Sequence, residues 1–324
     1  MKAIYDIICM GINLQLFAGE LNTQTTSSDG MSDEMKVFYS DYLIDNAVPK
    51  LVHDQFGQKH PIPKNGGKTI EFRKYDPLGK MLTPLTEGIT PDGQSLTVTT
   101  IEATVAQYGG YVTLSDMLLL TAIDNNLVQA TKLLGNQAGA TLDTITREVL
   151  NGGTNVIYAG GVEGRGALAA NLAVDDVKKA VRALKAQNAD KVDDSFVGII
   201  HPDVAYDLTN DPQWLSVKEY DPKDWYEGEI GKIHGVRFVE TTEAKIFDGG
   251  VYSTLILGDN AYGVTEIEGG GLQHIVKQLG SAGTGDPLNQ RATVGWKATK
   301  VAERLVEQFM VRIESKCTFS GAAN

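Results

Sequence analysis

One stretch between residues 114 and 150 constrains this chain more than any other, because a long apolar stripe is bounded by helix start and end signals. The stripe recurs at steps of seven, four, four, three and four residues, which places its members on one helix face: Leu127, Leu134, Ala138, Leu142, Ile145 and Val149. Asp124-Asn125-Asn126 caps the start of this helix, and Asn151-Gly152-Gly153 ends it, since glycine adopts the left-handed cap conformation without strain. Ser115 predicts a shorter helix just before. We therefore predict two helices in series, the second roughly 35 Å long.

Length, charge and cysteine content limit the possible classes of protein. The 324 residues suffice for about two domains. The formal net charge of −12 opposes binding to nucleic acid, so a protein that reads DNA sequence is not expected. Cys9 and Cys317 stand near opposite ends, which predicts reduced thiols. With no signal peptide and no apolar run of roughly 18 residues, we expect a soluble protein made in a reducing cytoplasm.

The N-terminal part is polar and carries one short apolar knot. Residues 11–31 are rich in Thr, Ser and Gln around Leu14, Leu16 and Phe17. Such a segment has too few apolar residues to form a core of its own. We therefore expect Leu14, Leu16 and Phe17 to contact a partner surface.

A long hairpin is predicted before the long helix that ends near residue 150, which we call the spine helix. Thr69–Tyr75 alternates apolar and charged residues, which is typical of a strand with one solvated face, and Leu96–Thr113 is a second strand region broken by Gly109-Gly110. Asp76–Ser95, between them, is rich in Pro and Gly and shows no periodicity. A structureless loop of about 20 residues is improbable inside a compact domain. It is either a lid over an active site or a hairpin tip ordered by a neighbouring subunit. The flanking strands lack convergent catalytic side chains, which favours the second interpretation.

The sequence after the spine predicts a second, α+β domain and a return to the first. A glycine-rich connection precedes an amphipathic helix at Val174–Gln187, whose outward face carries Lys178, Lys179, Arg182 and Lys185. Strands are expected at Phe196–Ile200, Gly231–Thr241, Tyr252–Leu257 and Leu272–Leu279. Gly280–Gly285 then leads to closing strands at Thr293–Lys297 and Phe309–Ile313, around a short helical stretch at Ala298–Glu307.

Candidate chemical motifs have simpler structural explanations. Gly66-Gly67-Lys68-Thr69 lacks the earlier glycine of a phosphate-binding loop. His201 and Asp203 flank Pro202 at the expected start of a helix. Glu266 with Glu268 would supply the acid and base of a hydrolase, although a solvated turn explains the pair better. We expect no catalytic, cofactor-binding or metal-binding residue.

Several blocks of sequence carry a family resemblance when taken together. They are Asn13–Ala18, Ile200–Val204, Gly228–Lys232 with Gly235–Thr241, Asp286–Lys297 and Met310–Glu314. In these residues, and in their order along nearly the whole chain, the sequence resembles the N4-type family of tailed-phage major capsid proteins. The resemblance starts after Met1–Met10, so Met10 is a second candidate start of translation.

The resemblance implies the Hong Kong 97-type capsid fold, of the α+β class, and a division of the chain into four parts. These are an N-terminal arm at 1–63, an extended β-hairpin loop at 64–113, a peripheral domain with the spine helix at 114–170 and 286–324, and an axial domain at 171–285. Contacts between subunits are expected from Leu14, Leu16, Phe17, Lys80, Leu85, Glu87, Arg291 and Trp296. Trp296 is equally consistent with the core of the peripheral domain.

The implied function is that of a major capsid protein of a tailed bacteriophage. Copies would assemble as hexamers and pentamers into an icosahedral shell around double-stranded DNA, without sequence-specific binding, membrane or cofactor. Expected partners are a scaffolding protein, a portal and a decoration protein, with assembly in the host bacterial cytoplasm and a final location in the virion. Two alternatives stay open, a hydrolase with residues 76–95 as its lid and an encapsulin-like nanocompartment shell of the same fold.

Overall fold

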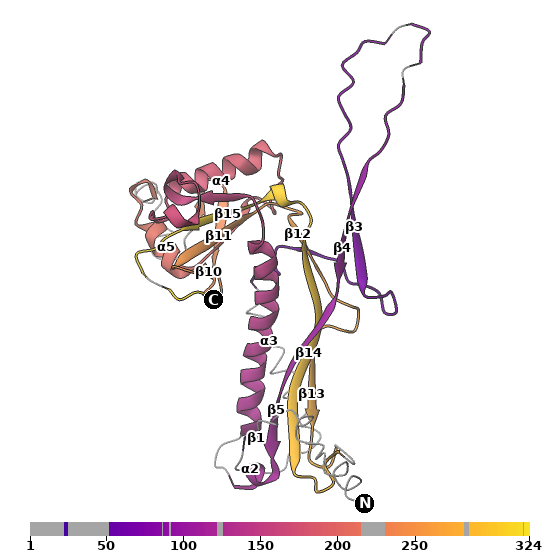
Figure 1. The fold of residues 1–324 in the computed structure, drawn as a ribbon, viewed down its shortest axis with the longest axis vertical. Coiled ribbons are helices and arrows are strands. Elements are labelled where there is room, and N and C mark those ends of the chain that lie inside the picture. Colours follow the sequence, from indigo (N-terminus) through magenta and orange to yellow (C-terminus); the bar gives the residue numbers. More distant parts are fainter. Residues whose placement is uncertain are drawn as a thin grey trace, which may run out of the picture. The chain divides into compact units, whose positions relative to one another are not determined.

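The computed structural model describes residues 23–24, 52–85, 87–90, 92–121, 126–214, 231–281, 285–319 and 321–324 (Figure 1). Within these ranges the chain forms two compact units, each of which is described by itself. The first contains residues 23–24, 109–121, 126–136, 273–281 and 285–297, and the second contains the rest. Leu14, Leu16 and Phe17 lie outside the described residues, so their expected contacts stay a prediction.

The predicted spine is confirmed as α3 (Asn126–Asn151), one helix of 26 residues (Figure 1). Its apolar stripe is largely buried, with side chains that are at most 8% exposed at Leu127, Leu134, Ala138 and Leu142. At its end, the Asn151 side-chain amide donates a hydrogen bond to the carbonyl oxygen of Arg147 at 2.8 Å. The helix ends at Asn151 as expected, but the predicted left-handed glycine cap is wrong, because neither Gly152 nor Gly153 has a positive φ.

The first unit contains closely spaced strands together with the first residues of α3. β13 (Gln273–Lys277) runs antiparallel to the first part of β14 (Arg291–Arg304), and β5 (Ala106–Ser115) is hydrogen-bonded to β14 as well. A β-carbon at Gly295 would stand 2.9 Å from the carbonyl oxygen of Gly110, so the absence of one permits this approach. β1 (Thr23–Gln24) pairs parallel with β5. After β5, Ser115 Oγ accepts the N–H of Leu118 at 3.2 Å and caps the predicted short helix α2 (Asp116–Thr121).

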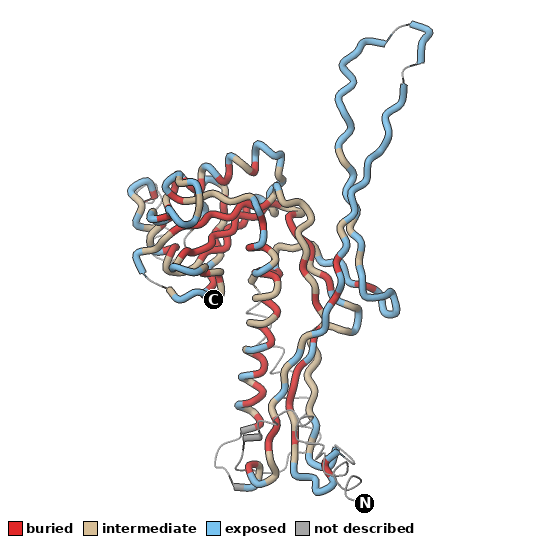
Figure 2. Tube along the Cα trace, in the orientation of Figure 1, coloured by how far each residue is buried: buried red, intermediate tan, exposed pale blue. Residues whose placement is uncertain are grey.

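The second unit contains a mixed sheet with the strand order β6-β15-β11-β7-β9-β8. Its strands are β6 (Val156–Tyr158), β15 (Met310–Ser315), β11 (Val251–Leu257), β7 (Phe196–Ile200), β9 (Val236–Glu240) and β8 (Lys232–Ile233), with β10 (Ile246–Phe247) paired to β11. Every residue of β7, β11 and β15 is buried (Figure 2). Strands that are buried along their whole length form the centre of a sheet that is covered on both faces.

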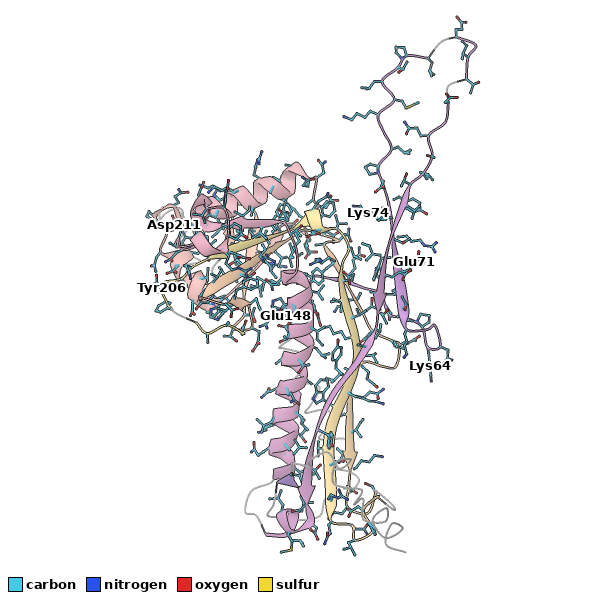
Figure 3. All side chains as sticks on the ribbon, viewed as in Figure 1. Lys64, Glu71, Lys74, Glu148, Tyr206 and Asp211 are labelled. Carbon is cyan, nitrogen blue, oxygen red and sulfur yellow. The ribbon has the colours of Figure 1, made fainter. Side chains whose placement is uncertain are left out.

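Helices α4 (Val174–Ala186) and α5 (Pro202–Thr209) pack on this sheet (Figure 1). The inner face of α4 is apolar, and Val177 and Leu184 are fully buried within one core that also includes Phe196 and Trp214. Asp211 holds the start of α4, because its carboxylate accepts the N–H of Val174 at 3.0 Å (Figure 3). The helix predicted at Val174–Gln187 and the strands predicted after it are therefore present as α4, β7, β9 and β11.

The remaining strands of the second unit form two small assemblies. β2 (Gln58–Lys59) pairs parallel with β12 (Tyr262–Thr265), which runs antiparallel to the last residues of β14. β3 (Thr69–Tyr75) and β4 (Val98–Thr104) form a separate hairpin. Short 3₁₀ turns occur at Ala159–Gly161, Arg165–Ala167 and Glu307–Phe309. The predicted strand region Leu96–Thr113 is interrupted at Val105, between β4 and β5, and not at its glycines.

The predicted helical stretch Ala298–Glu307 is wrong, because β14 continues as a strand to Arg304. The even-numbered residues from 292 to 302 of β14 are buried and most odd-numbered ones are not, which is the period of a strand. Lys300 occupies one of the inward positions and is 5% exposed. A lysine at an apolar position concealed the alternation, and tertiary packing overrode the helix propensity of the Ala, Lys and Glu residues.

Candidate interaction surface

The stem of the hairpin is a regular two-stranded ribbon. Thr69 of β3 lies opposite Thr104 of β4, and Tyr75 lies opposite Val98. Ile70 and Phe72 are half-buried, whereas Glu71 and Lys74 are exposed (Figure 3). The alternation predicted from the sequence is therefore present, with one face of the ribbon partly covered and the other in solvent.

The loop that joins the two stem strands has no regular structure in its described residues, 76–85, 87–90 and 92–97. The Asp76 N–H donates to the carbonyl oxygen of Thr97 at 3.1 Å, and the Gln94 side chain donates to the carbonyl oxygen of Gly79 at 2.9 Å. Figure 2 shows both arms of this loop exposed. A segment with so few internal contacts has little to hold it in one conformation as a single copy.

The loop nevertheless carries large apolar side chains in solvent. Leu82 is 84% exposed and Leu85 is 76% exposed. Further apolar side chains in this loop, each more than half exposed, are Leu78, Met81, Ile89 and Leu96. A contiguous exposed set of this kind marks a protein-interaction site, since burial of each side chain stabilises by about 1.5–3 kcal/mol. We name these six residues the apolar tip.

Lys80, Leu85 and Glu87, three of the predicted contact residues, lie in this loop and are exposed. Their exposure leaves them accessible to a neighbour, and their role in a subunit contact stays a prediction. Two charged side chains among apolar ones give the tip polar positions that would fix its orientation on a partner surface.

A groove of about 560 Å³ runs beside the stem within the second unit. Its apolar lining comes from Ile70, Phe72, Ile101, Leu305 and Val306, all of them half-buried. The His60 and Phe72 rings meet edge to face, with their centroids 5.9 Å apart. The stem therefore has an apolar side that the single copy covers only in part.

The chain just before the stem is fixed by a buried polar cluster that the sequence did not reveal. The backbone N–H of His53 donates to one carboxylate oxygen of Asp143 at 2.8 Å, and His53 Nδ1 lies 2.7 Å from the other. Tyr262 donates its hydroxyl to the carbonyl oxygen of His53. Because these groups are at most 1% exposed, the segment around residue 53 is held firmly against α3 and β12 within the second unit.

The same cluster includes the inward-facing lysine of β14. Lys300 Nζ donates to the carboxylate of Asp54 and, at 2.9 Å, to the carbonyl oxygen of Leu142. Thr146 donates to the other oxygen of Asp54 at 2.5 Å. Burial lowers the pKa of Lys300, and the Asp54 carboxylate opposes that shift. His53 looked like an isolated histidine in the sequence, because its partner Asp143 is 90 residues away.

Arg291 and Trp296, the predicted contact residues of the closing block, differ in exposure. The Arg291 guanidinium donates to the carbonyl oxygen of Gly285 at 2.8 Å, and its backbone N–H donates to Asp286 at 2.8 Å. Trp296 is 4% exposed and lies within the first unit, which favours the alternative that it belongs to the core. Its role, like that of Arg291, at a subunit contact stays a prediction.

The candidate chemical residues lie in structural positions. His201 Nδ1 accepts the N–H of Asp203 at 3.2 Å and so caps α5, as the sequence favours. Glu266 and Glu268 are both exposed after β12. In the part of the chain that the structure describes, no three His, Cys, Asp or Glu side chains gather to hold a metal ion, and no helix is long and apolar enough to cross a membrane.

The comparisons with known proteins place the chain in a family. The sequence model described as phage capsid protein matches residues 98–308, well over half of the chain. No curated protein matches the sequence. The fold is similar to that of the capsid of cyanophage Pam1, with 16% identity, a TM-score of 0.63, and coverage of 90% of this chain and 96% of that one.

Two further solved structures have the same fold. The capsid of Ralstonia phage GP4 is 15% identical, with a TM-score of 0.63, and the match covers 83% of this chain and 89% of that one. The capsid of cyanophage P-SCSP1u is 14% identical, with a TM-score of 0.62 and the same two coverages.

A spine helix, an α+β core and an exposed hairpin loop, together with the likeness to these three capsids, define the Hong Kong 97-type capsid fold. The chain belongs to the phage capsid protein family. It is a major capsid protein and not an enzyme, so the hydrolase alternative is not supported. Membership of a phage family also favours a viral shell over a cellular nanocompartment.

Proposed function

We propose that copies of this chain assemble as hexamers and pentamers into an icosahedral shell that encloses double-stranded DNA. The apolar tip is the observation that carries the proposal, because Leu82 and Leu85 are at least 76% exposed in the single copy. When a neighbouring copy covers such side chains, the burial of apolar surface lowers the free energy of the assembly. Two different surfaces meet in such a contact, so it repeats from copy to copy and closes into rings.

The same proposal assigns a place in the shell to each part of the chain. The arm at 1–63 and the hairpin at 64–113 lie across neighbouring subunits, the peripheral domain comprises 114–170 and 286–324, and the axial domain is 171–285. Contacts through several segments make the shell cooperative, since each further contact is then intramolecular. The sequence blocks that resemble the N4-type capsid proteins support membership of that subfamily.

The partners of the shell follow from its chemistry and from the resemblance. A net charge of −12 keeps the enclosed DNA confined, with counterions between it and the protein, rather than tightly bound. A scaffolding protein, a portal and a decoration protein complete the set of partners. Assembly takes place in the host bacterial cytoplasm, and the protein ends in the virion.

The experiment that tests the proposal compares the full chain with two variants of the apolar tip. Leu82→Ser/Leu85→Ser removes apolar surface, and Leu82→Met/Leu85→Met keeps it at the same positions. We expect closed shells of uniform diameter, by sedimentation and negative-stain electron microscopy, from the wild type and the methionine variant, and free subunits from the serine variant. Discrete monomers or dimers of the wild type under all salt conditions would refute the proposal.

A further inference from the structure

Three cationic side chains follow one another along the outer face of α4. Lys178, Arg182 and Lys185 are four and three residues apart, so they share one side of the helix. With His234 they line a groove of about 470 Å³ whose only other lining residues are Val181 and Ala186. We call Lys178, Arg182, Lys185 and His234 the α4 groove. The lining contains no carboxylate.

The cations of the groove are not neutralised within the described part of the chain. The carboxylates at the start of α4, Asp175 and Asp176, both pair with Lys179, which is outside the groove, at 2.9 Å. Within the described ranges, none of the four groove residues has a carboxylate within 4.0 Å, and Lys178 Nζ donates to the side-chain oxygen of Gln213 at 2.5 Å. Among the described residues, the groove therefore presents positive charge with no carboxylate of its own, which an outside partner can supply.

The backbone fixes one wall of the groove. His234 and Gly235 are the two residues between β8 and β9, with φ of 47° and 84°. Two consecutive positive φ angles define the type I′ hairpin turn, which is rigid and matches the twist of its strands. The imidazole of His234 is thus presented beside α4 by a fixed turn, so this wall of the groove is preformed, whereas its cations are on the flexible side chains of Lys178, Arg182 and Lys185.

The charge of the chain identifies the kind of partner. With 41 acidic and 29 basic residues, copies of this protein repel one another unless cationic surface meets carboxylates. From Lys178 to Lys185 the groove extends over roughly 10 Å of helix, since each residue rises 1.5 Å. That span matches a few carboxylates, whereas a protein that binds duplex DNA relies on about six to ten phosphate contacts.

We propose that the α4 groove binds exposed carboxylates of a second copy of this chain inside the shell. This inference rests on the proposed function and adds one electrostatic contact to it. The contact joins two different surfaces of the two copies, so it repeats around a ring in one direction. It gives an acidic protein an attractive contact at a place where its surfaces otherwise repel.

The first test reverses the charge of the groove and uses a control of equal net charge. Arg182→Glu/Lys185→Glu and the control Lys191→Glu/Lys277→Glu both replace two exposed lysine or arginine residues and change the net charge by the same amount. We expect the groove variant to assemble at least tenfold more slowly than the control, by light scattering at physiological salt, with unchanged thermal unfolding of the free subunit. Equal assembly of the two variants would overturn the inference.

The second test uses wild-type shells and does not depend on a variant that folds. Shells assembled from a mixture of ¹⁴N-labelled and ¹⁵N-labelled copies are treated with a carbodiimide, which joins lysine amines to carboxylates in contact. We expect mixed-isotope cross-links at Lys178 or Lys185, in empty shells as well as DNA-filled ones. Links confined to one isotope, or none at these lysines, would contradict the inference, as would a groove effect seen only with DNA, which would assign the groove to phosphate.

The two proposals fail in different ways. If the wild type forms no shells, the proposed function is wrong. If shells form and the groove variant assembles like its control, the function stands and the electrostatic contact is refuted.

Discussion

The Nδ1 atom of His53 lies 2.7 Å from a carboxylate oxygen of Asp143, and neither side chain is more than 1% exposed. The other oxygen of Asp143 accepts the backbone N–H of His53 at 2.8 Å. One carboxylate of α3 therefore fixes both the backbone and the ring of His53, close to the first described residue of the second unit. This anchor sets the place from which the chain continues into the hairpin that carries the apolar tip.

Removal of this carboxylate should loosen the anchor. Asp143→Ala leaves the His53 N–H and ring buried without their acceptor, and each buried group left without its hydrogen-bond partner costs about 1–3 kcal/mol. We expect that loss in the free energy of unfolding, by urea denaturation of the free subunit, and faster hydrogen exchange at the His53 amide. Thr141→Ala is the matched control on the same helix, because its hydroxyl bonds only to the carbonyl oxygen of Gln137. A similar loss in both variants would contradict the anchor.

Lys300 and Asp54 should be strongly coupled in stability. Lys300→Met keeps the volume of the side chain but leaves the Asp54 carboxylate without its cation, so we expect a loss of about 3–5 kcal/mol. In the double variant Asp54→Asn/Lys300→Met no charge is left unpaired, and much of the loss should be recovered. The measurement is a double-mutant cycle of unfolding free energies, and additive effects of the two substitutions would show that the pair is not coupled.

Acid should weaken the cap of α5. Burial lowers the pKa of His201, and the Asp203 carboxylate opposes that shift without cancelling it. The unfolded chain, with a histidine pKa near about 6.5, then binds the proton more readily than the folded protein. The contribution of His201 to stability is therefore complete above that value and is lost as the pH falls below it.

The comparison that isolates this effect uses His201→Asn, which keeps an acceptor for the Asp203 N–H and removes the titration. We expect the unfolding free energy of the wild type to fall more steeply than that of the variant between pH 7.5 and pH 5. Parallel pH profiles would show that His201 contributes nothing to the acid sensitivity.

The approach of β5 to β14 should not tolerate a β-carbon at Gly295. Such a carbon would lie 2.8 Å from Tyr111 Cβ and 2.9 Å from the Gly110 carbonyl oxygen, so backbone must shift. We expect Gly295→Ala to destabilise the subunit by about 1–3 kcal/mol, as overpacking usually does. Gly285→Ala, in the same unit, meets no atom within 4 Å and should be neutral or slightly stabilising. The measurement is the midpoint of thermal unfolding of the two variants. Equal midpoints would refute the claim that a β-carbon is not tolerated at Gly295.

Local pattern was sufficient for the elements whose residues carry their own signal. The 3.6-residue stripe from Leu127 to Val149 determined α3, because a helix forms its hydrogen bonds within one segment. The alternation in Thr69–Tyr75 likewise determined β3, and a continuous apolar run determined β7. The lack of periodicity in residues 76–95 likewise predicted that this segment is not part of a core.

Tertiary structure alone decided the features that join distant residues. Lys300 lies in a strand because β14 pairs with distant strands, and its side chain bonds to Asp54, 246 residues away, so no local rule contains either contact. The pairing of His53 with Asp143 and the meeting of His234 with the α4 lysines depend in the same way on how the chain folds back on itself. Sequence determined the local elements of this capsid protein because their hydrogen bonds are local, whereas buried charges and surface grooves depend on partners that only the complete fold brings together.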